Sequence, residues 1–298
     1  MKKIGEWLEF IIKEEWKDRT VFSILSEEIG ASKALIGQWR ETNSIKRNDT
    51  LADVNHKVCS GDHLSLHVFK TEPFNVTPTE QDIAVLYEDD HLIILNKQAN
   101  MNTHPNDPSD KDTLANGLAN YYKQHGIQTT INHIHRLDYG TSGAIIFAKH
   151  ALAQAILHKD LENRIIKRTY LAAVQGKVKQ KIGKIDLAIG RDRHHPTRRR
   201  VSPKGQKAIT NYNVDYYDNK NNISVLSLHL DTGRTHQIRV HLSHLGHPII
   251  GDELYGGKIN KMKRQALHAR KIRLIHPLTK EKIEVIAPLP PDMNWLNI

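Results

Sequence analysis

The sequence predicts an α+β protein with two domains, and three observations lead to this fold class. The chain has 298 residues, a length that favours about two domains and is sufficient to bury a hydrophobic core. Residues 71–80 carry two prolines and no apolar period, which indicates a linker between residues 1–70 and 81–298. From Ile83 onward, candidate strands and helices alternate irregularly, as they do in the α+β class.

Residues 1–70 are predicted to form a small α/β domain. Gly30 is expected to end a helix, and Ser32 can cap the next one. Residues 64–68 alternate between apolar and polar side chains and predict a strand. Two sets of residues recur at helical spacing and each predicts a helix: Trp7, Phe10, Ile11 and Glu14, and then Val21, Ile24, Leu25 and Glu28.

Residues 81–298 are predicted to form the larger domain. Asp112 or Thr113 can cap a helix that runs to about residue 125. A helix is expected to open after Gly233 and to end at Gly246, because Pro248 prevents its restart. The remaining predicted elements are strands over residues 83–87, 92–95, 144–148, 165–174 and 224–230 and a helix over residues 150–163.

The charge balance favours a polyanionic partner. Lysine and arginine exceed aspartate and glutamate by 43 − 33 = 10, and an excess of this size favours nucleic acid through counterion release. Residues 191–200 hold five arginines together with a proline, which predicts a loop that can lie along RNA phosphates. A generally basic protein with a solvated charge run is the alternative. The expected RNA contacts in this segment are Arg193, Arg198, Arg199 and Arg200.

The sequence predicts neither a membrane span nor a disulfide. No run of about 18 apolar residues is present, and the N-terminus lacks the apolar stretch of a signal peptide. We therefore expect a cytoplasmic protein. Cys59 is the single cysteine, so an internal disulfide is excluded, in agreement with a reducing compartment.

The most informative stretch is residues 135–143, His-Arg-Leu-Asp-Tyr-Gly-Thr-Ser-Gly. It places the carboxylate of Asp138 beside the cation Arg136 on a glycine-containing turn that leads into an apolar strand. Catalytic side chains concentrate on loops that rigid elements hold in place. The alternative is a surface turn whose Asp bonds only its own backbone.

Two further blocks contain residues of the kinds that such a site needs. Residues 168–172 place Tyr170 on a predicted strand, where packing in the core is the alternative role. Residues 231–242 read Asp-Thr-Gly-Arg-Thr-His-Gln-Ile-Arg-Val-His-Leu and supply Arg239. A buried carboxylate tends to take up a proton, and an adjacent guanidinium keeps it ionised and fixes its direction.

These three blocks resemble the motifs of RluA-type (RluA/RluD-like) RNA pseudouridine synthases. Residues 135–143 match H-R-L-D-x-x-T-S-G throughout, residues 168–172 match Lys/Arg-x-Tyr-x-Ala, and residues 232–241 contain T-G-R-x-H-Q-I-R-V-H. The resemblance implies an α+β fold with a mixed, largely antiparallel sheet, flanking helices and a central cleft. The residues to which it assigns roles are Asp138, Tyr170 and Arg239 as catalytic, Arg136, Arg234, His236 and Gln237 as RNA-binding, and Leu267 as a pocket wall.

The resemblance also implies the reaction and the partners. Uridines in RNA, in rRNA rather than tRNA, would be isomerised to pseudouridine by an Asp nucleophile after the target base is flipped out. Whether the carboxylate acts at the sugar or at the base stays open. An isomerisation without redox change needs no cofactor and no metal, and we expect a monomer. Residues 1–70 loosely resemble the RNA-binding domain of ribosomal protein S-four.

One segment departs from the family pattern. The family shows N-K-P-x-G-M-x-V-H-P where residues 96–105 have Gln98, Asn100 and Thr103 in place of proline, glycine and valine. Asn100 can still adopt the positive φ of a turn.

Two other functions compete with the pseudouridine synthase. An RNA-binding module without catalysis, such as a ribosome-assembly factor, is the second hypothesis. A metal-dependent hydrolase is the third, because His241, His244 and His247 recur at helical spacing.

Overall fold

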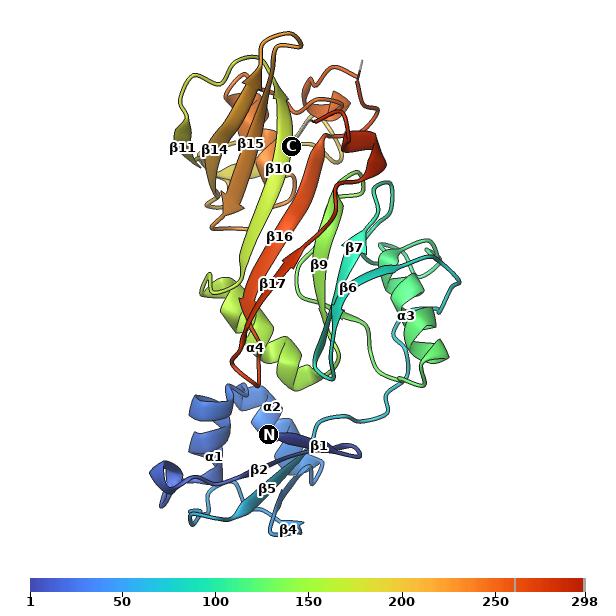
Figure 1. Ribbon diagram of the computed structural model, residues 1–298. Helices are drawn as coiled ribbons and strands as arrows, with labels where there is room; N and C mark the ends of the chain where they lie inside the picture. The colour runs from blue at the N-terminus through green and yellow to red at the C-terminus, as the bar shows by residue number, and fades with distance from the viewer. Residues whose placement is uncertain (260, 297–298) are drawn as a thin grey trace.

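The computed structural model describes residues 1–259 and 261–296, which build two large sheets and one two-stranded ribbon (Figure 1). A five-stranded sheet belongs to the N-terminal part, and a long sheet of ten strands runs through the rest of the chain. In Figure 1 the N-terminal part lies below one end of the long sheet, next to α4 (Ala151–Glu162). Leu152 and Ile156 of α4, with Leu278, belong to the same buried apolar cluster as the N-terminal core, so the two parts pack together.

The N-terminal sheet is antiparallel and has the order β1-β2-β5-β3-β4. A helical segment ends at Gly30, which adopts φ +86°, and Oγ of Ser32 accepts the N–H of Leu35 at 3.2 Å where α2 begins. Both features confirm the sequence prediction. The elements are β1 (Lys2–Ile4), β2 (Trp7–Ile11), η1 (Glu14–Trp16), α1 (Val21–Ser23), η2 (Ile24–Ile29), α2 (Lys33–Glu41), β3 (Ile45–Arg47), β4 (Thr50–Leu51) and β5 (His63–His67).

The helix predicted from Trp7 to Glu14 was wrong, because this segment contains β2. Leu8 and Phe10 are buried and pair with Leu66 and Leu64 of β5, so the inward side chains follow a period of two. The apolar residues at helical spacing included Ile11, which is exposed. Tertiary pairing with β5 decided between the two periodicities.

The long sheet is mixed and largely antiparallel, as the family resemblance implies. Its order is β11-β14-β15-β10-β16-β9-β7-β6, with β17 paired to β16 and β8 to β9, and β9 and β16 run parallel. The strands are β6 (Ala84–Glu88), β7 (Leu92–Lys97), β8 (Asn132–His133), β9 (Ser142–Ala148), β10 (Lys167–Gln175), β11 (Ile182–Asp186), β14 (Ile209–Asp218), β15 (Ile223–Leu230), β16 (Leu267–Ile275) and β17 (Lys282–Ile286).

Helices cover both faces of this sheet. Helix α3 (Leu114–Gln124) packs Leu118 and Tyr122 into one apolar cluster with Ile93 and Phe147. Helix α4 packs on the other face, where Ala153 and Leu157 join Ile94 and Ile146. The further elements are α5 (Gln237–His244), the ribbon strands β12 (Ile189–Arg191) and β13 (Arg199–Val201), and the short turns η3 (Glu253–Tyr255) and η4 (Pro291–Met293).

The parallel pairing of β9 with β16 fixes the turn that carries Asp138. Gly143 lies opposite Ala269 in this pairing and adopts φ +114°. A Cβ at Gly143 would lie 2.3 Å from the backbone oxygen of Ala269, so only glycine fits. The neighbouring segment keeps its turn as expected, because Asn100 adopts φ +60°. Among the described residues, no helix is both long and apolar enough to span a bilayer.

Candidate active site

A cleft of about 590 Å³ collects most of the residues that the sequence singled out. Asp138 reaches it from the turn before β9, Tyr170 from β10 and Arg239 from α5. The ribbon arginines lie outside its lining. The predicted residues that line the cleft are Arg136, Asp138, Tyr170, Arg234, His236, Gln237, Arg239 and Leu267.

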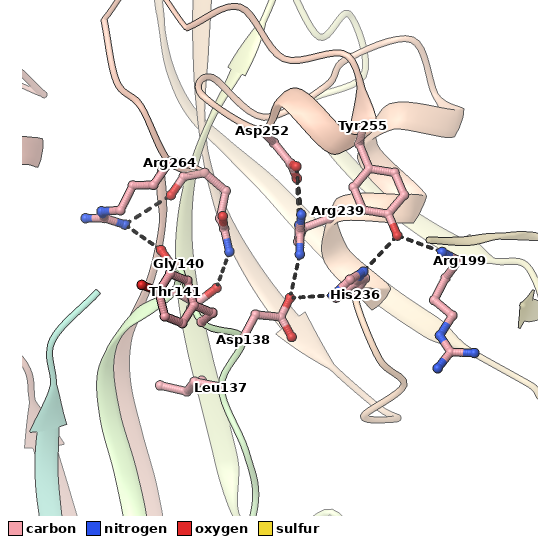
Figure 2. Close-up of polar contacts among 12 residues, drawn as sticks. Leu137, Asp138, Gly140, Thr141, Arg199, His236, Arg239, Asp252, Tyr255 and Arg264 are labelled. Carbon is pink, nitrogen blue, oxygen red and sulfur yellow. Dashed lines mark hydrogen bonds and ion pairs between the residues drawn. The ribbon is translucent and has the colours of Figure 1, made fainter. Parts of the chain in front are cut away.

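Arg239 joins two carboxylates at the centre of the site (Figure 2). Its Nη1 donates to Oδ2 of Asp138 at 3.2 Å, which confirms the contact expected from the motifs. Its Nε and Nη2 donate to the two oxygens of Asp252 at 2.7 and 2.8 Å. Burial alone would lower the pKa of Arg239, but the bonds and charges of Asp252 and Asp138 raise it above the usual value. The guanidinium is therefore a permanent, oriented cation.

Asp252 is a second carboxylate at the site, and the sequence analysis gave it no role. Its side chain is 1% exposed, and it follows Gly251 in a turn that packs against the chain before β16. A Cβ at Gly251 would lie 2.0 Å from the backbone oxygen of Arg264, and one at Gly257 would lie 1.9 Å from that of Ile249. The glycines of this segment were the sequence signal that could have pointed to Asp252, since they mark a close approach of backbones.

His236 lies beside the same carboxylate, in an unusual backbone conformation. It adopts φ +58° directly before α5, and its Nε2 is 3.9 Å from Oδ2 of Asp138. Its Nδ1 is 2.9 Å from the hydroxyl of Tyr255, whose ring lies 4.9 Å from the guanidinium carbon of Arg239. Burial lowers the pKa of His236, and the charge of Asp138 opposes this shift. The imidazole is therefore neutral at neutral pH.

Gln237 is turned into the protein although it borders the cleft. Its Nε2 donates to the backbone oxygen of Ile209 and to Oγ1 of Thr210, at 2.9 and 3.0 Å. Its Oε1 accepts from Oγ1 of Thr232 and from the backbone N–H of Arg234. These four bonds use the whole bonding capacity of the amide. Gln237 thus fixes the loop before α5, and its direct contact with RNA stays a prediction.

Tyr170 and Leu267 form an apolar wall of the cleft. They lie on the adjacent strands β10 and β16, and both side chains are buried. Burial raises the pKa of Tyr170, and the nearby guanidinium of Arg168 opposes that rise. The phenol is therefore protonated at neutral pH and offers a flat ring to a ligand. This arrangement suits stacking with a planar base.

Lys97 is a second residue that the sequence analysis left without a role. Its side chain is fully buried, and its Nζ donates to the backbone oxygens of Gln98, Met101 and Tyr139 at 2.8, 2.6 and 3.3 Å. Burial lowers the pKa of Lys97 to about 7, while the charge of Asp138 opposes the shift. Lys97 therefore connects residues 96–105, the segment that departs from the family pattern, to the turn that carries Asp138. In the sequence, Asn96 and Lys97 were noted only as the first two residues of the family pattern over residues 96–105.

The predicted arginine loop is a loop only over residues 192–198. On both sides the chain pairs as the ribbon β12–β13. Arg193, Arg198 and Arg200 are exposed, whereas Arg199 is half-buried and its backbone N–H donates to the hydroxyl of Tyr255 at 2.9 Å. The ribbon therefore carries exposed positive charge, and Figure 2 shows Arg199 joined through Tyr255 to His236 of the site. Arg136 is also exposed, at the cleft itself.

Of the two histidines in α5, His241 is engaged with the protein, whereas His244 is exposed. His241 is buried, with Nδ1 2.9 Å from Oγ1 of Thr210 and Nε2 2.9 Å from the backbone oxygen of Leu187. In residues 1–259 and 261–296 no group of three His, Cys, Asp or Glu side chains is arranged to hold a metal ion. The metal-dependent hydrolase therefore has no supporting geometry in this part of the chain.

Known proteins resemble the chain in both sequence and fold. Residues 91–244 match the family described as RNA pseudouridylate synthase, and residues 8–64 match the RluD ribosomal pseudouridine synthase N-terminal domain. The uncharacterized RNA pseudouridine synthase YhcT of Bacillus subtilis (strain 168) is 46% identical over 99% of this chain and 98% of that protein. The ribosomal large subunit pseudouridine synthase D of Haemophilus influenzae is 34% identical over 92% and 88%.

The solved structures include the human RNA pseudouridylate synthase domain containing 1. It is 26% identical to this chain, with a TM-score of 0.59, and the match covers 73% of this chain and 89% of that one.

Proposed function

The chain belongs to the RNA pseudouridylate synthase family and is an RNA pseudouridine synthase, and on this premise we propose that it modifies specific uridines of large-subunit rRNA. Asp138 is the nucleophile in this proposal, and the target base is flipped out of its helix. The observation that carries it is the contact of Arg239 with Asp138 beside the wall of Tyr170 and Leu267. A relative whose name specifies the ribosomal large subunit supports the choice of substrate.

The reaction moves one bond and consumes nothing else. The bond between ribose and N1 of uracil breaks, the base turns, carbon 5 joins the anomeric carbon, and the proton of carbon 5 is exchanged for one on N1. A carboxylate stabilises an electron-poor anomeric carbon in glycoside chemistry, which is the related task. Arg239 keeps Asp138 ionised and aimed for this step. The cleft must exclude water, because hydrolysis would release the detached base.

The flipped nucleotide needs a surface that binds it, and a side chain must fill the gap that it leaves in the RNA helix. Tyr170 supplies a ring on which uracil stacks, with Leu267 beside it. The raised pKa of Tyr170 favours this stacking role, and proton removal from carbon 5 by the same phenol would require that it first ionise. Arg136 is exposed at the cleft and can occupy the gap in the RNA helix.

We propose that the chain is divided into an RNA-binding part, a linker and a catalytic part. Residues 1–70 form an RNA-binding domain like that of ribosomal protein S-four, residues 71–80 a linker, and residues 81–298 the catalytic domain. One chain supplies every residue of the proposed site, which supports action as a monomer. The free, exposed Cys59 agrees with a cytoplasmic location.

Neutralising the ribbon should weaken RNA binding and its salt dependence. Changing Arg198, Arg199 and Arg200 to Gln removes three charges, so the slope of log K against log salt should fall by about 2 for single-stranded contacts. Filter binding or anisotropy at several salt concentrations measures the slope. The matched control changes the same residues to Lys, which keeps the charge and should keep the slope. An unchanged slope in the Gln variant would remove the ribbon from the interface.

The proposed substrate is tested by a pseudouridine map of total RNA. Cells lacking the protein are complemented with wild type or with Asp138→Ala, and large-subunit rRNA is compared in each. Sites that vanish on deletion and return only with wild type establish both substrate and activity. If the pseudouridines that depend on the protein lie only in tRNA, the rRNA assignment is overturned while the enzyme class stays unchanged.

A further inference from the structure

Tyr255 lies behind the proposed catalytic pair and has no role in the chemistry above. It is buried in η3, three residues after Asp252. Asp252 holds Arg239, and the Tyr255 hydroxyl contacts His236 (Figure 2). One short turn thus supports both groups that face Asp138. Oγ of Ser243 in α5 donates to the backbone oxygen of Tyr255 at 2.8 Å, which attaches this turn to the helix carrying Arg239.

The hydroxyl of Tyr255 has two partners among the described residues, and they determine where its proton lies. The backbone N–H of Arg199 donates to it at 2.9 Å and occupies one acceptor site. The other partner, Nδ1 of His236, is also at 2.9 Å. A backbone amide can only donate, so Nδ1 is the one acceptor available there for the phenol proton. With Nδ1 accepting, a neutral His236 carries its own proton on Nε2.

The opposite tautomer is electrostatically unfavourable. If His236 carried its proton on Nδ1, the lone pair of Nε2 would face Oδ2 of Asp138 at 3.9 Å. A lone pair facing a carboxylate is repulsive, and the phenol proton would lose its acceptor in a buried place. With the proton on Nε2, an N–H dipole points at the carboxylate instead. The 3.9 Å separation exceeds a hydrogen bond, as is common before a substrate closes a site.

We propose that Tyr255 is a positioning residue whose hydroxyl holds His236 in the tautomer that directs Nε2–H at Asp138. Two donors, from Arg239 and His236, then converge on Oδ2. No bond from the described residues reaches the other oxygen, so Oδ1 is the atom left to meet the nucleotide. His236 is thereby assigned to the carboxylate rather than to RNA. The inference rests on the proposed function of Asp138.

The tautomer can be measured without any substrate. Protein with ¹⁵N-labelled histidine is studied by long-range ¹H–¹⁵N NMR at neutral pH, and the His236 signals are assigned as those missing in His236→Gln. Wild type should show a single Nε2–H tautomer. Tyr255→Phe keeps the ring under Arg239 but removes the hydroxyl, and it should give a mixture of tautomers. A wild-type Nδ1–H tautomer, or an unchanged spectrum in Tyr255→Phe, would overturn the inference.

Kinetics give the second readout. Tyr255→Phe should lower kcat about three- to tenfold, the scale of one hydrogen bond, and leave KM within about twofold. Tyr217→Phe is the matched control, because that hydroxyl bonds Asn222, both residues lie outside the cleft lining, and its loss should leave kcat unchanged. Gln has no tautomers, so in the His236→Gln background Tyr255→Phe should cause no further loss. An equal loss in both backgrounds would mean that Tyr255 only supports the fold.

The two proposals fail in distinguishable ways. A wild-type protein that modifies no RNA contradicts the proposed function, while the NMR tautomer still reports on Tyr255. An active wild type whose kcat is indifferent to Tyr255→Phe contradicts only the positioning role. Melting temperatures of all variants, which are expected to lie close to wild type, separate these outcomes from unfolding.

Discussion

Asp138→Asn should abolish pseudouridine formation and leave RNA affinity within about threefold. The amide has nearly the shape of the carboxylate, but it carries no charge and is not a nucleophile, so turnover should fall more than about 10⁴-fold. The positive residues expected to hold RNA, on the ribbon and at Arg136, are untouched. Single-turnover assays on rRNA fragments measure the first effect, and anisotropy measures the second.

The control for this variant is Asp215→Asn. Asp215 is exposed on β14, where it accepts from Oγ of Ser227, and it lies outside the cleft lining. Its replacement should change neither turnover nor affinity by more than about twofold, as expected for surface substitutions. Retained turnover in Asp138→Asn would refute the nucleophile assignment. A large loss of affinity would show instead that the Asp138 carboxylate takes part in ground-state binding.

Arg239→Ala should cost both activity and stability. It removes the donor to Asp138, and it also leaves Asp252, whose side chain is 1% exposed, as a buried carboxylate without its cation. Removing one partner of a buried ion pair typically costs about 3–5 kcal/mol. Chemical denaturation measures the loss in the free energy of unfolding, and the same preparation is assayed for turnover.

A second substitution separates the two effects. In Arg239→Ala combined with Asp252→Ala, the unpaired charge is gone, so the double variant should be more stable than Arg239→Ala alone. Its activity should stay absent, because Asp138 still lacks its donor. If the double variant were as unstable as the sum of the two single ones, Arg239 would stabilise the protein through packing rather than through Asp252.

Local sequence was sufficient to predict each feature that depends only on neighbouring residues. The cap at Ser32, the stop at Gly30 and the positive φ of Asn100 involve contacts or backbone geometry within a few positions. The family motifs were recognisable for the same reason, since residues 135–141 form one loop that leads into β9, and residues 231–242 form one loop and the start of α5. The resemblance then supplied the contact of Asp138 with Arg239, although 101 positions separate them.

The sequence by itself determined the α+β class, the family motifs and the net positive charge of the chain. Only the tertiary structure decided that residues 7–11 form a strand, because β5 offers a partner that a local pattern does not contain. It alone brought Asp252 and Tyr255 behind Arg239 and His236, and Lys97 under the Asp138 turn. These side chains act through contacts between distant segments, and the energy of such a contact depends on burial that exists only once the chain has folded.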